Sequence, residues 1–257
     1  GLYAIAIPAL LLLLLAGAEM LWPRRALVLG RYPRWRTHVM FFATNAVVGR
    51  LLSFIIVIGV AANWAEVQQF GALRIVALPF WVEAAIAVII LDFALWLQHL
   101  AMHRFGWLWP MHAIHHSDRD LDVTTALRFH PFELIVSTLY KSAIVALLGV
   151  PLVVALAFEI WLNANALFNH SNIRLPKSLD RLLRPFLVTP DMHLVHHSTI
   201  VEEQKHNFGF ALTIWDRMFG TYRAESIVGA EKQKIGLAEV DDARPAGFLW
   251  SMKQPLT

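Results

Sequence analysis

The sequence predicts an all-α membrane protein with about four to five membrane helices, arranged as three spans plus a helical hairpin, and a cytosolic helical cap. Two observations lead to this prediction. First, 57% of the 257 residues are hydrophobic and only 16% are charged, whereas soluble domains carry about 25% charged residues. Second, the hydrophobic residues gather in blocks long enough to cross a bilayer, which is typical of membrane helices.

Three apolar blocks in the first hundred residues predict the three spans. Residues 2–18 are uncharged, and we expect an anchor helix rather than a signal peptide because no basic region precedes them. The second and third spans are predicted over residues 38–64 and 79–100. The loop at 23–37 is expected to face the cytoplasm because it is rich in arginine. These arginines are Arg24, Arg25, Arg31, Arg34 and Arg36.

Two further apolar segments, residues 134–148 and 151–166, flank a turn at Gly149 and predict the helical hairpin. We expect one domain over residues 1–257, in which 1–100 and 133–170 are mainly transmembrane. Residues 101–132 and 171–257 are then mainly cytosolic cap. Arg174, Lys177, Arg181 and Arg184 predict a helix on the membrane surface under anionic headgroups.

The cap and the span ends carry three histidine clusters. His99 and His103 are spaced i, i+4, and two later sets are spaced i, i+3, i+4, so that each set projects from one side of a helix. The later sets are His112, His115 and His116, and His193, His196 and His197. Eight histidines exceed the needs of one four-coordinate site. The clusters therefore predict a histidine-rich dimetal site, or one site held from two sides.

The chain contains no cysteine, so any metal must use nitrogen and oxygen ligands, which suits zinc, copper, iron or nickel. A site where membrane helices meet the cytosol favours a lipid substrate. A buried redox metal beside lipid favours O2-dependent chemistry at C–H bonds. The alternatives are a zinc-dependent membrane hydrolase and a non-enzymatic membrane protein that binds metal or haem. We expect no nucleic-acid partner, because aromatic residues do not interleave the basic ones.

The ordered clusters resemble the fatty acid hydroxylase / sterol desaturase superfamily of integral-membrane histidine-box di-iron oxygenases. The resemblance runs from Asp92 to Tyr222 and includes the Asn207-Phe208-Gly209 and Trp215-Asp216-Arg217-Met218-Phe219-Gly220-Thr221 motifs. The segment Thr124-Thr125-Ala126-Leu127-Arg128 is similar to the bacterial sterol-desaturase-like subgroup and to alkylglycerol monooxygenases.

This resemblance implies a lipid hydroxylase or desaturase with two iron ions and O2 as co-substrate. It implies electrons from a separate reductase or from a ferredoxin or cytochrome b5-like protein. Zinc can replace iron on the same ligands during purification. The expected location is the bacterial inner membrane, with the active site on the cytoplasmic face.

The resemblance also adds His170 as a ninth ligand, and it implies no catalytic side chain beyond the dimetal site. The expected metal ligands are His99, His103, His112, His115, His116, His170, His193, His196 and His197. Candidates for further ligands, or for groups that orient the imidazoles, are His130, Asp92, Asp118, Glu133, Asn169, Asp191 and Asn207. For this second set, helix capping or solvation is an equally good interpretation.

Overall fold

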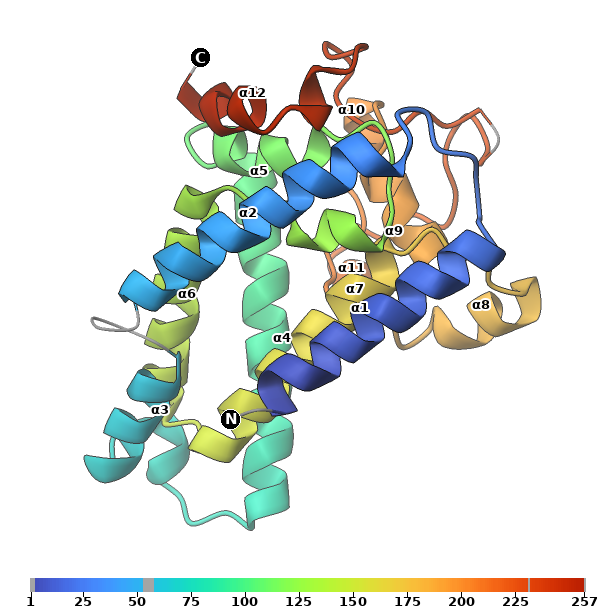
Figure 1. The fold of residues 1–257 in the computed structure, drawn as a ribbon. Coiled ribbons are helices and arrows are strands. Elements are labelled where there is room, and N and C mark those ends of the chain that lie inside the picture. The colour runs from blue at the N-terminus through green and yellow to red at the C-terminus, as the bar shows by residue number, and fades with distance from the viewer. Residues whose placement is uncertain (1–2, 53–57, 231, 257) are drawn as a thin grey trace.

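A computed structural model describes residues 3–52, 58–230 and 232–256 of the chain (Figure 1). The described residues are mainly helical, and their extended pairing is limited to three isolated bridges, which confirms the all-α prediction. The helices are α1 (Tyr3–Leu21), α2 (Arg31–Leu52), α3 (Ile58–Val67), η1 (Ala72–Arg74), α4 (Phe80–Arg104), α5 (Trp109–His116), η2 (Val123–Leu127), α6 (Pro131–Leu148), α7 (Leu152–His170), α8 (Lys177–Leu183), α9 (Pro190–His196), α10 (Val201–Gln204), α11 (Ile214–Met218), η3 (Arg244–Ala246), α12 (Phe248–Lys253) and η4 (Gln254–Leu256).

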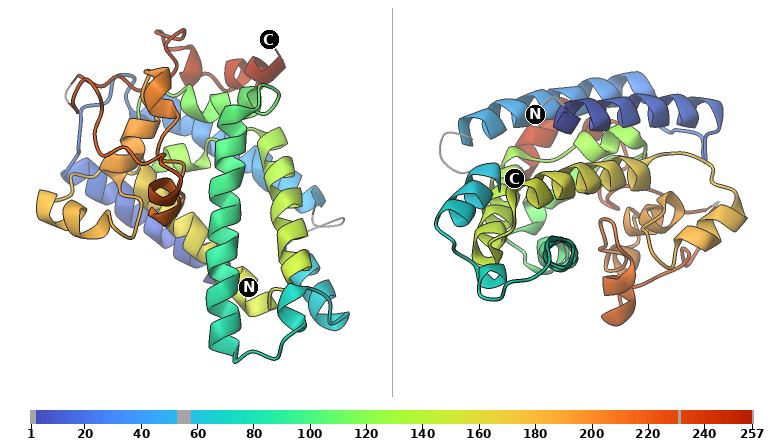
Figure 2. Two further views of the ribbon diagram at one scale, coloured as in Figure 1. Left: turned by 180° about the vertical axis from the view of Figure 1, so that it is seen from behind. Right: turned by 90° about the horizontal axis from the view of Figure 1, so that it is seen from below.

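The long helices form two layers, with a group of short helices at one end. Helices α1 and α2 lie in an outer layer, where α1 packs against α7 and α2 packs against α6 (Figure 2). Helix α4 stands behind them and also contacts α6 and α7. The short helices α5, α9, α10 and α12 gather around the end of α4 where that helix finishes (Figure 1). This arrangement brings the ends of α4 and α7 to the same region.

Among the residues that the structure describes, three helices are long and apolar enough to cross a membrane: α4, α6 and α7. Helix α1 is a shorter apolar helix, counted over Ala6–Leu21. The predicted span at 38–64 is covered by α2 and α3, and residues 53–57 within it lie outside the described residues. The apolar helices therefore match the predicted fold class, and the third span and both hairpin segments are helices of sufficient length.

The turn after α6 explains where the two hairpin helices separate. Gly149 ends α6 with a φ of 70°, in the left-handed region that favours glycine. A Cβ on Gly71 would lie 2.2 Å from the backbone nitrogen of Gly149, so two glycines permit this close contact. Helices α6 and α7 diverge from the turn instead of packing as a closed hairpin, because α6 packs on α2 and α3 while α7 packs on α1 (Figure 1).

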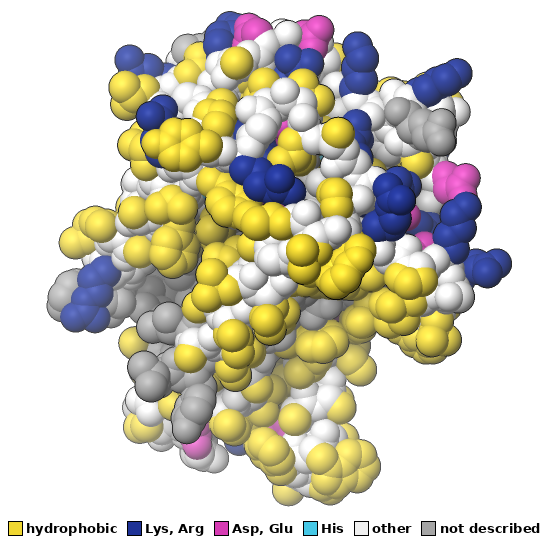
Figure 3. Space-filling view, turned by 45° about the vertical axis from the view of Figure 1, so that its right-hand side comes forward, with side chains coloured by type: hydrophobic (Ala, Val, Ile, Leu, Met, Phe, Trp, Pro, Cys, Tyr) yellow, Lys and Arg dark blue, Asp and Glu magenta, His cyan; other side chains and the backbone are white. Residues whose placement is uncertain are grey.

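The interior changes from apolar to polar along α4. One buried hydrophobic cluster joins α3, α4, α6 and α7 and includes Ala87, Leu91, Val154 and Phe158. Beyond Leu95, the buried side chains of the short-helix end include many histidines and carboxylates and two arginines among hydrophobic residues. The surface shows a similar division, with lysine and arginine side chains mostly above and hydrophobic side chains mostly below in Figure 3. This is the distribution expected of a protein that enters a membrane from one side.

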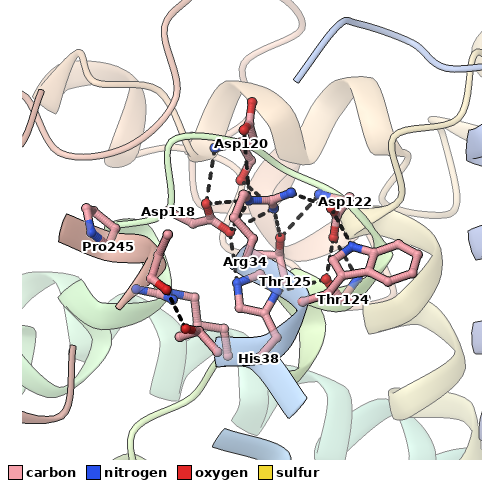
Figure 4. Close-up of polar contacts among 12 residues, drawn as sticks. Arg34, His38, Asp118, Asp120, Asp122, Thr124, Thr125 and Pro245 are labelled. Atoms are coloured by element: carbon pink, nitrogen blue, oxygen red, sulfur yellow. Dashed lines mark hydrogen bonds and ion pairs between the residues drawn. The ribbon is translucent and has the colours of Figure 1, made fainter. Parts of the chain in front are cut away.

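A buried ion-pair network joins α2 to the loop after α5 (Figure 4). Arg34, with no exposed surface, donates from Nε to Asp118 Oδ1 at 2.8 Å and from Nη2 to Asp118 Oδ2 at 2.8 Å, and it also pairs with Asp122. Burial alone would raise the pKa of Asp118, but Arg34 and His38 more than offset this and hold that pKa well below its usual range. The network keeps two carboxylates charged in the protein interior.

The position of Arg34 corrects the predicted loop at 23–37. Helix α2 begins at Arg31, so Arg31, Arg34 and Arg36 lie on a helix and not in a loop. The physical reason is that Asp118 and Asp122 neutralise Arg34, so the helix can extend into the polar end with a buried arginine. Arg24 and Arg25 do lie in the connection between α1 and α2.

We expect Arg34→Met to lower the free energy of unfolding by about 3–5 kcal/mol, because Asp118 and Asp122 would stay buried without their cation. The measurement is the unfolding midpoint of the detergent-solubilised protein. Arg36→Met is the matched control, since Arg36 is exposed on the same helix and should change stability by no more than about 0.5 kcal/mol. Equal midpoints for the two variants would show that the network does not stabilise the fold.

Candidate metal centre

Nine histidines converge from four helices at the polar end of the molecule. Helix α4 supplies two, α5 three and α7 one, and α9 with the residue that follows it supplies three. Eight of the nine are buried, and His103 is half-buried. The three histidine clusters and His170, which are up to 98 residues apart in the sequence, therefore meet in one place.

The ring nitrogens form two groups, and within each group one nitrogen of every member lies within 4.8 Å of the others. The first group is His99, His103, His112, His116 and His196, and the second is His115, His170, His193 and His197. Each group could hold a metal ion. The rings of His116 and His197 stack between the groups, with centroids 4.4 Å apart.

Helices α5 and α9 each contribute to both groups. On α5, the i and i+4 residues His112 and His116 join the first group, and His115 joins the second. On α9 the pattern is reversed, since His193 and His197 join the second group and His196 joins the first. The repeated i, i+3, i+4 spacing therefore lets each short helix contribute ring nitrogens to both groups. One histidine cluster in the sequence does not correspond to one group in the structure.

Hydrogen bonds at Nδ1 fix the tautomers of three rings in the first group. The Nδ1 of His99 lies 2.8 Å from the Phe208 carbonyl, that of His196 lies 2.7 Å from the His206 carbonyl, and that of His112 lies 2.8 Å from Glu133 Oε1. Carbonyl and carboxylate oxygens only accept, so each Nδ1 carries the hydrogen and each neutral ring has a lone pair on Nε2.

These lone pairs point at one another. The Nε2 of His99 lies 3.1 Å from that of His112 and 3.0 Å from that of His196. In the second group, Nδ1 of His170 lies 2.6 Å from the Ala166 carbonyl and Nδ1 of His115 lies 3.3 Å from the Arg128 carbonyl, while their Nε2 atoms are 2.9 Å apart. Two lone pairs at this distance repel each other unless a cation lies between them.

Burial keeps the cap histidines neutral. The pKa values of His115, His116, His193 and His197 lie well below the usual range, and that of His196 falls to about 3, chiefly because burial disfavours the charged ring. Neutral imidazole is the form that binds metal. Protonation therefore does not relieve the repulsion near neutral pH, and the donor set fits metal ions.

Residues 206–209, which we call the orienting loop, hold two of these carbonyl acceptors in place. Asn207 has a left-handed φ of 58°, and its side-chain amide donates to the Met192 and Arg223 carbonyls. Asp216 accepts from the backbone N–H of Phe208 and of Gly209, both at 2.9 Å. A Cβ on Gly209 would lie 2.8 Å from the Leu212 carbonyl oxygen, so only glycine fits there.

Two of the predicted orienting residues lie against the site. Glu133 bonds His112 directly, and it is on the first turn of α6. The side-chain hydrogen bonds of Asn207 within the described residues go to backbone groups and anchor the orienting loop. Asn169 donates to the Phe210 carbonyl at 2.8 Å, and its Oδ1 has no partner among the residues that the structure describes.

The other candidates have different partners, and none of them belongs to either histidine group in the described part of the chain. Asp92 accepts from Trp215 Nε1 at 2.7 Å, Asp118 pairs with Arg34, and Asp191 pairs with Arg24 at 2.7 Å. His130 is the N-cap of α6 and accepts from the Phe132 N–H. These four side chains are therefore engaged with partners outside the two histidine groups, and His130 has the helix-capping role that was the equally good interpretation.

Sequence reasoning missed Asp216 as a supporting residue, although the motif that contains it was recognised. It also missed the backbone carbonyls of Phe208, His206, Ala166 and Arg128. A signal existed for Asp216, since it is the only carboxylate in the closing motif from Trp215 to Thr221. No sequence signal exists for a carbonyl, which every residue carries.

A sequence model of the fatty acid hydroxylase family matches residues 84–221, more than half of the chain. Ornithine lipid hydroxylase OlsE of Rhizobium tropici is 33% identical over 153 residues, covering 56% of this chain and 43% of that protein. Alkylglycerol monooxygenase of Homo sapiens is 30% identical over 163 residues, covering 61% and 33%. Cholesterol 25-hydroxylase of Homo sapiens is 28% identical over 149 residues, covering 54% and 51%.

The matched region thus spans 43%, 33% and 51% of the lengths of these relatives. No solved structure matches this chain.

We expect Glu133→Ala to weaken metal binding by about 10–100-fold, because His112 would lose the carboxylate that fixes its tautomer. The measurement is a competition titration of the purified protein with a chelator. Glu159→Ala is the control, since Glu159 pairs with Lys141 and with neither histidine group. If both variants bound metal like the unaltered protein, Glu133 would not support a ligand.

Proposed function

The chain belongs to the fatty acid hydroxylase family, and on this premise we propose that it is a membrane di-iron oxygenase acting on a lipid. The reaction is hydroxylation, or desaturation, of an aliphatic C–H bond with O2 and electrons from a separate protein. The relatives support an oxidative lipid reaction, since they are named as a lipid hydroxylase, an alkylglycerol monooxygenase and a cholesterol hydroxylase.

The observation that carries the proposal is the convergence of Nε2 lone pairs within each histidine group. The first group would hold one iron through His99, His103, His112, His116 and His196, and the second would hold another through His115, His170, His193 and His197. In hydroxylation, the bound irons would supply the activation of O2, with one oxygen atom entering the lipid and the other leaving as water.

The protein positions the imidazole rings, keeps them neutral and excludes water from the centre. The carbonyls of Phe208 and His206 and the carboxylate of Glu133 turn three rings toward one point. Neutral ligands leave the positive charge of the ions uncompensated, and burial of eight of the nine rings shields the centre from solvent. No side chain has to act as nucleophile or general acid, and we assign none.

A zinc-dependent hydrolase fits this geometry less well. The first group offers five imidazoles, which exceeds the four ligands of a tetrahedral zinc site. A hydrolase also needs a base beside the metal, and the nearby carboxylate of Glu133 is engaged with Nδ1 of His112.

The ends of the apolar helices indicate how a lipid would reach the site. His99 and His103 lie in the last turns of α4, and His170 is the last residue of α7, and both helices are candidate spans. Arg24 and Arg25 lie at this same end, where they contact Asn172. By the positive-inside rule, these arginines support a site at the cytoplasmic face, which in a bacterium would be that of the inner membrane.

The electron donor would approach where the metal centre is least covered. His103 is the half-buried member of the nine, and it lines a cavity of about 310 Å³ with Trp109, Arg104 and Lys205. The ring of Trp109 lies 5.0 Å from that of His103. We propose this cavity as the side that a reductase, ferredoxin or cytochrome b5-like protein meets.

The test compares whole-cell lipids by mass spectrometry between a host that expresses the chain and one that expresses His115→Ala. A lipid that gains one oxygen only with the unaltered chain is the expected result, and a lipid that loses two hydrogens would make the enzyme a desaturase. The variant should abolish the change, since His115 is a ligand of the second group.

His206→Ala is the matched control, because His206 contributes its backbone carbonyl and not its ring to the site. The control should keep the product. Identical lipid profiles for all three cultures, despite two irons in the purified protein and a supplied reductase, would contradict the proposed reaction.

A further inference from the structure

Helix α8 and the turn that follows it expose hydrophobic side chains that no other described part of the chain covers. Leu179, Leu182 and Phe186 are 40%, 67% and 67% exposed. Leu179 and Leu182 are three residues apart on α8 and face the same way, and Phe186 lies in the turn that follows the helix. A short helix with its apolar side turned away from the protein body is typical of a helix that lies in the membrane interface.

The opposite side of this segment is basic and faces a cavity. Lys177, Arg181 and Arg184 are spaced four and three residues apart and line a cavity of about 530 Å³, which Leu194 and Val195 of α9 also line. A second cavity of about 660 Å³ adjoins it, shares Arg24 and Lys177, and adds Arg174. The two cavities form one basic recess along α8.

The positive charge of this recess is only partly neutralised. Arg24 pairs with Asp191 at 2.7 Å, and Arg184 pairs with Asp180 at 2.6 Å. Across the described residues, no carboxylate lies within ion-pair distance of Lys177, Arg181 or Arg174. Glu225 also lines the 530 Å³ cavity. The basic side chains of the recess still outnumber its carboxylates, so a surplus of positive charge remains.

The recess lies at the level where the apolar helices end. The backbone N–H of Arg174 donates to the Trp22 carbonyl at 3.0 Å, which ties the segment before α8 to the residue that follows α1. Leu21 and Trp22 are themselves 69% and 66% exposed. The basic side chains of this face lie mostly above its hydrophobic ones (Figure 3), as at a membrane surface.

We propose that α8 lies in the plane of the membrane interface and that the recess binds the phosphate headgroup of an anionic phospholipid. Arginine and lysine are suited to phosphate oxygens, and the acyl chains would cover Leu182 and Phe186. An acidic protein would satisfy the cations but leave these side chains in water, so the paired apolar and basic sides favour a lipid. This site is separate from the metal centre, and its test does not depend on turnover.

The test uses native mass spectrometry of the full chain in detergent with equal amounts of phosphatidylglycerol and phosphatidylcholine of the same acyl chains. The unaltered protein should retain phosphatidylglycerol in preference. The double variant Lys177→Gln/Arg181→Gln should lower the ratio of the two retained lipids by on the order of tenfold, since each basic residue contributes to anionic-lipid binding.

Arg36→Gln/Lys253→Gln is the control, because it removes the same charge from exposed positions on α2 and α12. The control should retain phosphatidylglycerol and phosphatidylcholine in the same ratio as the unaltered protein. Three results would each overturn the proposal: no preference in the unaltered protein, an equal effect of both double variants, or displacement of the lipid by inorganic phosphate alone, which would make the recess a site for free anions.

Discussion

The structure depends on one constraint, which is that oxygen acceptors behind the imidazoles decide where their lone pairs point. The carbonyls of Phe208, His206 and Ala166 take the Nδ1 hydrogens of His99, His196 and His170, so Nε2 of each ring faces the centre. Lone pairs only 2.9 to 3.1 Å apart are unfavourable in a site without a cation. The hydrogen bonds at Nδ1 therefore make this polar interior suited to hold metal ions.

The rest of the fold keeps these acceptors and rings fixed. Asp216 holds the orienting loop, residues 206–209, through two backbone N–H groups and also accepts from Trp96 on α4. The loop and α4 therefore share one carboxylate, which sets the distance between His99 and its acceptor. On the other side, Arg34 joins α2 to the loop that follows His115 and His116. Both buried carboxylate networks are costly to desolvate, and each is satisfied by several partners.

Much of the fold and of the candidate site could be predicted from the sequence, because it depends on residues that are close together in the chain. Histidine spacing predicted a shared centre, apolar blocks predicted the helices, and Glu133 was among the candidates that orient an imidazole. The division of α5 and α9 between two groups could not be predicted, since it depends on how each helix is rotated about its axis. Asp118 follows His116 closely in sequence, yet the chain turns after α5 and places its carboxylate on Arg34. Arg34 was expected in a loop, and its pairing with Asp118 and Asp122 could not be predicted because they lie 84 and 88 residues away.

The central claim is that the nine histidines hold two redox metal ions in separate groups. The most direct measurement is the iron content per chain, by elemental analysis, of protein prepared anaerobically with excess iron. The account predicts two irons in the unaltered chain and one in His103→Ala, which alters the first group, and in His193→Ala, which alters the second. A chain without transition metal, or one ion shared by both groups, would contradict the account.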